Sequence, residues 1–325
     1  MVEFLKLIRW KNLIIVIATM VMVRYLLLDS LLSQMMVLSA DGEMVATTLR
    51  LPWHDFLALI IAAVCLTAGG YVINDYFDIK TDLINRGTII VGTVIPRRKA
   101  MMIHNVLNLI GVVAGFYVSW RVGYFWLGTV FLLVSGLLWF YSASYKRQFL
   151  IGNIIVGLLT ALVPFMVVFY EFPALFSYYS SNAVGQPDYR LLFMWTGGFS
   201  LFAFLTTIVR EIIKDIEDFE GDMEYGRHTL PVVSGIKSTK YIVTALIISI
   251  IAALYLVWML YVSDMITLVY ISAALTLPLL LTIYMVLTGR GKKHFQASST
   301  VMKFVMLMGL LYTVVVKVIL VTGTY

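Results

Sequence analysis

Two acidic stretches of this chain decide its fold: NDYFDIKTD at residues 74–82 and REIIKDIEDFEGD at residues 210–222. Each stretch ends a long apolar run, so each places charge at the end of a hydrophobic segment. In the first stretch, Asn74, Asp78 and Asp82 recur at every fourth position. A step of four residues on an α-helix returns to nearly the same face, so these side chains are predicted to point in one direction.

The second stretch repeats this spacing, because Arg210, Lys214, Asp218 and Asp222 also lie four residues apart. Carboxylates on one helix face repel one another, and charge at a membrane boundary is costly. Something must compensate for this cost. Hard divalent cations, held by the carboxylates together with a substrate diphosphate, are the natural candidates.

The composition is that of a polytopic membrane protein. Of the 325 residues, 61% are hydrophobic and 13% are charged, whereas soluble domains have about a quarter charged residues. A membrane-spanning helix needs about 20 apolar residues. The sequence contains nine such candidates, at residues 12–28, 56–77, 101–119, 123–143, 151–170, 191–212, 239–262, 265–287 and 298–321.

Several other classes of protein are excluded or disfavoured. Lys6, Arg9 and Lys11 precede the first span, but no small-residue cleavage site follows it, so we expect no cleaved signal peptide. The single cysteine, Cys65, excludes an intramolecular disulfide and a cysteine metal cluster. The four histidines show no zinc-ligand spacing, and there is no glycine-rich nucleotide loop.

The net charge of +6 is informative through its placement. Basic residues gather before span 1 and in every second loop after it, whereas the alternate loops hold only Arg50, Arg121 and Arg190. By the positive-inside rule, the N-terminus is predicted to be cytoplasmic and the C-terminus outside, in the cell membrane. Both acidic stretches then lie on the cytoplasmic side. Because topology explains the basic bias, no nucleic-acid partner is expected.

The chain has the layout of a weak internal duplication. Four spans separate the two acidic stretches, and each stretch leads into a polar loop. Such repeats often place a site at their interface, so the stretches are predicted to face each other across one cavity. Residues 29–55 and 171–190 are expected to be external loops, and segment 172–190 a surface connector because it contains Pro173 and Pro187.

The first stretch is predicted to hold Mg2+. Asn74 and Asp78 are best placed to offer oxygens to one ion, with Asp75 and Asp82 beside them. Mg2+ keeps several waters and commonly shares its ligand sphere with phosphate. A solvated helix end with scattered acids is the alternative, but a second, matching cluster argues against it.

In the second stretch, Asp218 and Asp222 mirror the acids of the first. Lys214 and Arg210 lie one and two turns earlier, deeper toward the membrane, where cations need acids or a bound anion as partners. Local ion pairing of Glu211 along the helix is the simpler explanation for part of this stretch.

Further polar residues lie at the ends of spans. Asn153 lies just inside span 5, and an amide in lipid needs a hydrogen-bond partner. Arg86, Arg97 and Arg98 follow the first stretch and could bind phosphate oxygens in a bidentate manner. Charge retention in the cytosol explains Arg97 and Arg98 equally well, and snorkelling explains Arg9.

With these motifs, the chain resembles the UbiA superfamily of intramembrane prenyltransferases. That family pairs an NDxxDxxxD motif on helix 2 with a DxxxD motif on helix 6, which match residues 74–82 and 218–222. Residues 210–222 and 229–231 resemble the branch of digeranylgeranylglyceryl phosphate synthases. The chain departs from that branch at residues 87–92, where the branch usually has a Pro- and Arg-containing stretch ending in Pro-Ser-Gly.

The resemblance implies an all-α membrane protein, with nine transmembrane helices around a central cavity in one domain of residues 1–325. It implies Mg2+-dependent transfer of a prenyl group from a polyprenyl diphosphate to an acceptor in the membrane, for which we favour a geranylgeranylglyceryl phosphate-like lipid. We expect Arg210, Lys214 and Asp215 to be catalytic. The expected substrate-binding residues are Arg9, Asn12, Asp75, Arg86, Lys146 and Asn153. The expected metal ligands are Asn74, Asp78, Asp82, Asp218 and Asp222.

Two rival functions remain open at this stage. An aromatic prenyltransferase of quinone, chlorophyll or haem biosynthesis would carry the same acidic motifs but needs fewer basic residues for its acceptor. A cation transporter would use the acids as an ion path. Transporters usually place such acids near the bilayer midplane, whereas here they lie at the ends of spans.

Overall fold

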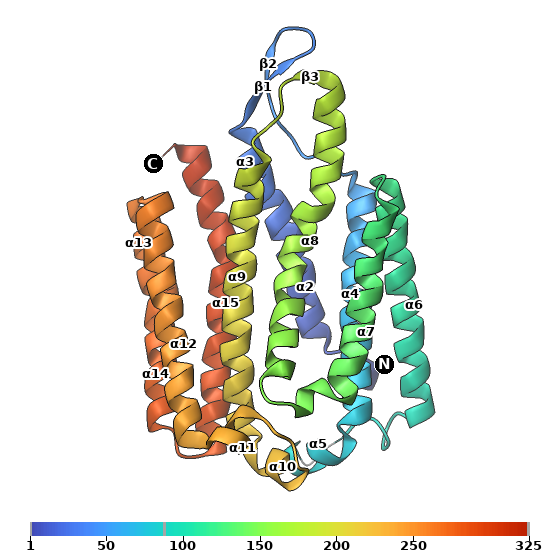
Figure 1. The fold of residues 1–325 in the computed structure, drawn as a ribbon, viewed down its shortest axis with the longest axis vertical. Coiled ribbons are helices and arrows are strands. Elements are labelled where there is room, and N and C mark those ends of the chain that lie inside the picture. Colours follow the sequence, from blue (N-terminus) through green and yellow to red (C-terminus); the bar gives the residue numbers. More distant parts are fainter. Residues whose placement is uncertain (1, 87–88, 324–325) are drawn as a thin grey trace. The chain divides into compact units, whose positions relative to one another are not determined.

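The computed structural model describes residues 2–86 and 89–323, and it confirms the all-α polytopic fold (Figure 1). In these residues, nine helical segments are long and apolar enough to cross a membrane, in the predicted order. The first joins α2 (Trp10–Met22), the π-helical turn η1 (Val23–Leu28) and α3 (Asp29–Ser33). The next five are α4 (Trp53–Phe77), α6 (Arg97–Arg121), η2 (Phe125–Gly128) with α7 (Thr129–Ala143), α8 (Ile151–Asn182) and α9 (Tyr189–Glu217). The last three are α12 (Ile236–Val257) with η4 (Trp258–Val262), then α13 (Met265–Tyr270) with η5 (Ile271–Thr276) and α14 (Leu277–Thr288), and α15 (Lys292–Thr322).

The chain divides into two compact units. Unit 1 comprises Met1–Tyr145 with Val163–Thr196, and unit 2 comprises Lys146–Leu162 with Gly197–Tyr325. Helices α8 and α9 each contribute to both units. The first acidic stretch belongs to unit 1 and the second to unit 2.

In unit 1, α4, α6 and α7 pack side by side (Figure 1). Glycines allow the close approach of α4 and α6. A Cβ atom at Gly69 would lie 2.9 Å from the Asn108 amide nitrogen, and one at Gly111 would lie 2.8 Å from Leu66. Small residues serve this purpose in membranes, where helices associate through close van der Waals packing. The packing holds the end of α4, and thus the first acidic stretch, in place.

The segment between the first two spans contains strands that the sequence did not predict. Strand β1 (Met36–Ser39) pairs antiparallel with β2 (Met44–Ala46), with Val37 opposite Val45. On its other side β1 pairs antiparallel with β3 (Ala183–Val184), so that the strand order is β2-β1-β3. The expected external loop of residues 29–55 therefore contains a helical turn and a hairpin.

A buried ion pair fixes this segment to α8. Arg24 in η1 donates from Nε to a carboxylate oxygen of Glu171 at 3.1 Å, and their side chains are 3% and 0% exposed. The other Glu171 oxygen accepts hydrogen bonds from the backbone N–H groups of Arg50 and Leu51, at 2.5 and 2.7 Å. A buried charge needs such partners, because leaving it unpaired is strongly destabilising.

The predicted surface connector of residues 172–190 is wrong in its first half. Helix α8 continues through Pro164 and Pro173 and ends at Asn182. Proline removes one helical hydrogen bond, but the extension is stabilised by packing, since Leu175 and Tyr179 are buried. The Tyr179 hydroxyl also accepts a hydrogen bond from the Thr48 N–H at 2.9 Å.

Unit 2 has its own apolar core, formed by α9, α12, α14 and α15. Ile213 of α9, Val243 of α12 and Met302 of α15 are fully buried in it. A Cβ atom at Gly309 would lie 2.2 Å from the Phe202 ring, so α15 can approach α9 closely only because this residue is glycine. This packing anchors the last turns of α9, in which the second acidic stretch begins.

Candidate functional site

The first acidic stretch is not one continuous helix, as the spacing had suggested. Helix α4 ends at Phe77, Asp78 has φ −91° and ψ 5°, and the short helix α5 (Ile79–Arg86) follows. These dihedral angles lie in the bridge region, where many active-site residues are found. The helical register nevertheless continues. The Asp78 N–H donates to the Asn74 carbonyl at 3.0 Å, and the Asp82 N–H donates to the Asp78 carbonyl at 2.8 Å.

Asp78 is the most enclosed acid of this stretch, with 6% of its surface exposed. Because the register is kept, Asn74, Asp78 and Asp82 still follow one another at helical spacing along unit 1. The predicted step of four residues therefore holds although the helix is interrupted at its central acid.

Asp75 has a cationic partner. The short helix α1 (Val2–Leu7) ends before Arg9, which has φ 51° and ψ 53°, and this left-handed turn leads into α2. Arg9 Nη2 donates to a carboxylate oxygen of Asp75 at 2.9 Å, and its guanidinium lies 4.8 Å from the centre of the Tyr71 ring. Asn12 donates from its amide to the Tyr71 hydroxyl at 3.1 Å. Three of the expected substrate-binding residues, Arg9, Asn12 and Asp75, therefore meet around Tyr71.

This arrangement keeps Arg9 charged. Burial by itself lowers the pKa of its guanidinium, but attraction to Asp75 and Tyr71 outweighs burial and the pKa is raised. Arg9 is thus a fixed cation beside the first stretch.

The second stretch has the same construction. Helix α9 ends at Glu217, Asp218 has φ −93° and ψ 7°, and α10 (Phe219–Glu224) follows. The Asp218 N–H donates to the Lys214 carbonyl at 2.9 Å, and the Asp222 N–H donates to the Asp218 carbonyl at 3.0 Å. Again the helix is interrupted at the central acid while its register is maintained.

Asp222 is only 2% exposed, and Arg227 donates to one of its carboxylate oxygens at 3.2 Å. Burial is the main reason that the pKa of Asp222 is raised to about 6; the Asp218 charge raises it further, and Arg227 lowers it. A divalent cation at this carboxylate would favour its ionised form.

Asn153 and Asp215 come together in unit 2. The Asn153 amide donates to a carboxylate oxygen of Asp215 at 2.8 Å, which is the partner that the sequence required for this amide. Asn153 belongs to the first turn of α8 and Asp215 to the last turns of α9. On the same helix, Arg210 contacts Glu211. Among the described residues, the buried Nε of Arg210 has no hydrogen-bond partner.

The loop between α7 and α8 approaches the second stretch. It contains the 3-10 turn η3 (Tyr145–Arg147), in which Lys146 is buried. The Arg147 carbonyl accepts a hydrogen bond from the His228 N–H at 2.9 Å, so this loop contacts the segment that follows α10. The side chain of Arg86 lies outside the described residues, as do residues 87–88 of the segment that departs from the family pattern.

The donor set of each stretch suits Mg2+. Within residues 2–86 and 89–323, no three side chains of the His, Cys, Asp and Glu types converge into a group that could hold a metal alone. Mg2+ is usually held by one or two carboxylates together with water and substrate phosphate. Asp78 with its neighbours, and Asp218 with Asp222, offer such small sets of oxygens. The buried state of Asp78 and Asp222 favours a bound cation, because burial penalises an uncompensated carboxylate.

Two charged groups of the structure were missed by sequence reasoning. Arg24 lies within the first span, and Glu171 lies in α8 one residue beyond the predicted span 151–170; both side chains are buried. An ionisable residue inside a span is rare and usually paired, so the occurrence of Arg24 in the first span was the signal that could have indicated such a pair.

Known proteins resemble this chain over most of its length. The UbiA prenyltransferase family matches residues 35–310. The digeranylgeranylglyceryl phosphate synthase of Methanosphaera stadtmanae is 31% identical over 255 residues, which are 77% of this chain and 84% of that protein.

Two solved structures have the same fold. A digeranylgeranylglyceryl phosphate synthase structure superposes with a TM-score of 0.61 at 24% identity, covering 97% of this chain and 98% of that one. A UbiA homologue from Archaeoglobus fulgidus bound to DMAPP and Mg2+ has a TM-score of 0.51 at 13% identity, with 97% and 99% covered. The chain is therefore a polytopic membrane enzyme that belongs to the UbiA prenyltransferase family.

Proposed function

We propose that this protein transfers a prenyl group from a polyprenyl diphosphate to the hydroxyl of a geranylgeranylglyceryl phosphate-like lipid, in a reaction that requires Mg2+. The observation that carries the proposal is the matched construction of the two acidic stretches. Each places a buried or half-buried aspartate in the bridge region at the end of a membrane span, with a second aspartate one turn later.

The aspartates are proposed to hold the metal. Asp78, Asp82 and Asn74 would do so in the first stretch, and Asp218 and Asp222 in the second. Bound Mg2+ would neutralise the diphosphate and stabilise the charge that develops on it as it leaves. The A. fulgidus homologue was solved with DMAPP and Mg2+, which supports a role for Mg2+ in the proposed reaction.

The cations near the stretches are proposed to bind the leaving diphosphate. Arg210 has a buried Nε without a hydrogen-bond partner in the described residues, so it can donate to an added oxygen. Lys214 lies one turn further along α9. Both would stabilise negative charge that grows as the bond breaks, which is the kind of interaction that accelerates a reaction.

In the proposed step, the bond between the allylic carbon and the diphosphate oxygen breaks, and the electron pair leaves with the diphosphate. The acceptor hydroxyl oxygen then forms the new C–O bond and loses its proton. We propose that Asp215 takes this proton, because Asn153 holds its carboxylate in one orientation at 2.8 Å. Surrounding apolar helices would keep out the water that competes for an allylic cation.

The acceptor is proposed to carry a phosphate. Relatives that are named digeranylgeranylglyceryl phosphate synthases support this choice. Lys146 is buried in a loop that hydrogen bonds to the segment after α10, and it adds a cation beside the second stretch. A lysine or arginine that binds an acceptor phosphate would orient the hydroxyl toward the allylic carbon.

We further assign residues 1–325 to one catalytic domain, because the family match of residues 35–310 crosses both compact units. The N-terminus is assigned to the cytoplasm and the C-terminus to the opposite side of the cell membrane, because basic residues gather in alternate loops. On this assignment, water-soluble diphosphate is released into the cytoplasm.

A competition assay tests the acceptor. The purified full chain, with Mg2+ and labelled geranylgeranyl diphosphate, is given an isoprenyl glycerol phosphate, 4-hydroxybenzoate and a dihydroxynaphthoate together. We expect label in the glycerol lipid. Preferential labelling of either aromatic acid would reject the lipid acceptor and favour an aromatic prenyltransferase, whereas label in none of them would reject prenyl transfer to these acceptor classes.

A further inference from the structure

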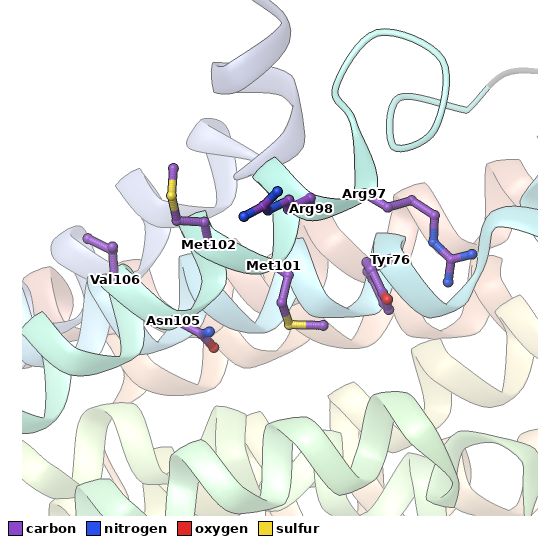
Figure 2. A pocket seen from close by; sticks show the side chains of 7 residues that line it. All are labelled: Tyr76, Arg97, Arg98, Met101, Met102, Asn105 and Val106. Carbon is purple, nitrogen blue, oxygen red and sulfur yellow. The ribbon is translucent and has the colours of Figure 1, made fainter.

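A stripe of side chains on α6 is not used by the proposed reaction. Residues 97, 101 and 105 lie four apart, and so do residues 98, 102 and 106, so the two rows run side by side on one face of the helix. Together with Tyr76 from α4 they line an open pocket of about 550 Å3. Figure 2 shows these side chains along α6 and the Tyr76 ring next to them. The pocket lies wholly within unit 1.

The pocket changes character along its length. Arg97 and Arg98 are the first two residues of the membrane span α6, so its cationic end lies at the boundary of the span. One turn and two turns further in lie Met102 and Val106, which are 59% and 50% exposed. Cations at the boundary and exposed apolar side chains within the span make the lining amphipathic.

The two arginines are available to bind an anion. In the described part of the chain, neither of them pairs with a carboxylate. The Arg97 guanidinium lies over the Tyr76 ring, 4.6 Å from its centre, which is a cation–π contact with an uncharged side chain. Arg98 extends along the helix toward Met102 (Figure 2). Asp75, the acid adjacent to Tyr76, is already bound by Arg9.

We propose that this pocket binds an anionic membrane lipid. Arg98 would hold the phosphate of its head group, for which the arginine fork is well suited, and Arg97 would add a second positive charge at the same end of the pocket. The hydrocarbon chain would lie along Met101, Met102 and Val106, where flexible methionine side chains adapt to an irregular apolar surface. A free phosphate would use only the cationic end of the pocket, so the recognised ligand is an amphiphile with a phosphate head.

Lys99 provides a control for the alternative that the basic residues only orient the chain in the membrane. It is exposed in the same helical turn and carries the same charge, but it does not line the pocket. If the basic residues served only to orient the chain in the membrane, Lys99 and the two arginines would contribute alike to lipid binding. If the pocket binds a lipid, only the arginines matter.

The test uses the full chain in mixed detergent micelles and native mass spectrometry to measure the affinity for phosphatidylglycerol. The comparison ligands are phosphatidylcholine, which has no net charge, and glycerol phosphate, which has no chain. The variants are R97Q/R98Q, K99Q as the charge control, M102Q/V106Q for the chain contact, and V113Q as an apolar control further along α6. No Mg2+ or prenyl diphosphate is present, so D78A should bind phosphatidylglycerol as the parent protein does.

Phosphatidylglycerol is expected to bind more tightly than either comparison ligand. A basic residue near a membrane surface contributes about 1 kcal/mol to binding of anionic lipid, so R97Q/R98Q should weaken the affinity about thirtyfold. M102Q/V106Q should also weaken the affinity for phosphatidylglycerol, whereas K99Q and V113Q should change this affinity less than about threefold. A loss of about fivefold or more in K99Q, which is the effect of one ordinary surface charge, or equal binding of phosphatidylcholine, would overturn the proposal.

Discussion

Asp78 and Asp218 have the same backbone conformation, with φ and ψ of −91° and 5° in one and −93° and 7° in the other. Each ends a membrane-spanning helix and begins a short one, and each carbonyl accepts a hydrogen bond from an aspartate four residues later. The duplication predicted from the spacing of acids therefore extends to the backbone. A bend at the same position in both stretches is a reason to assign both acids the same task.

Loss of an acid from either stretch should stop turnover. We expect Asp78→Ala and Asp222→Ala each to lower kcat/KM about a hundredfold or more, the usual cost of a deleted transition-state stabiliser. If both stretches serve one reaction step, the double variant should be little slower than the slower single variant, because residues that act as a unit have non-additive effects. The measurement is labelled prenyl transfer by purified protein. D41A, in the exposed turn between β1 and β2, is the control, and near-normal turnover of both single variants would refute the assignment.

Removal of Mg2+ should abolish activity without unfolding the protein. The core of each unit is apolar, and the residues that the acidic stretches add to it, such as Ile213 and Ile216, are apolar as well, so these core contacts do not require a metal. Treatment with EDTA should therefore eliminate prenyl transfer and leave the thermal midpoint of the apo protein within a few degrees of its value before chelation. Mg2+ together with a prenyl diphosphate should raise that midpoint, because a ligand that binds only the folded state stabilises it. An enzyme that turns over at full rate in excess EDTA would contradict a metal-assisted mechanism.

The Arg9–Asp75 pair should be energetically coupled. Both side chains are part-buried and lie 2.9 Å apart, so R9Q leaves the Asp75 carboxylate without this partner, and D75N leaves the Arg9 cation without its carboxylate. We expect each single variant to lower kcat/KM, and the double variant R9Q/D75N to lose less than the sum of the two. A coupling free energy of about 1 kcal/mol is expected for a part-buried pair. Strict additivity would show that the two residues act independently.

Asn153 should act through Asp215. The variant N153L removes the hydrogen bond to the carboxylate and leaves a side chain of similar volume. We expect turnover to fall about tenfold or more, because loss of a residue that orients a functional side chain typically has an effect of this size. N153Q, which keeps an amide, should recover part of the rate. The measurements are kcat at saturating substrate and the thermal midpoint of unfolding, for N153L, N153Q and D215N. If N153L lowers only the midpoint and not kcat, its role is structural.

The buried Arg24–Glu171 pair should matter for stability. Breaking it with R24M or E171Q leaves a buried charge or unsatisfied donors, and we expect a loss of about 3 kcal/mol in the free energy of unfolding. The double variant R24M/E171Q should regain much of this loss, because both charges are then absent while the amide oxygen at position 171 can still accept from the Arg50 and Leu51 N–H groups. Unfolding can be followed by circular dichroism in detergent with increasing SDS. Single variants as stable as the parent protein would contradict a structural role for the pair.

Much of the acidic site could be predicted from the sequence because its spacing is local. Positions four residues apart are related by helix geometry alone, and the hydrogen bonds across Asp78 and Asp218 preserve that relation. The need of Asn153 for a partner could also be predicted, since an amide at the end of a span needs one. That the partner is Asp215 depends on two helices that are distant in the sequence.

What the sequence by itself determined is the membrane class, the nine spans that the described residues contain, and the two acidic stretches, because length, hydropathy and helical period are properties of consecutive residues. Only the tertiary structure decided the pairing of Arg9 with Asp75 and of Arg24 with Glu171, the strands of the hairpin, and the extension of α8 through Pro173. These features depend on contacts between residues far apart in the chain. A proline predicts the end of a helix locally, but the burial of Leu175 and Tyr179 stabilises the helix beyond it.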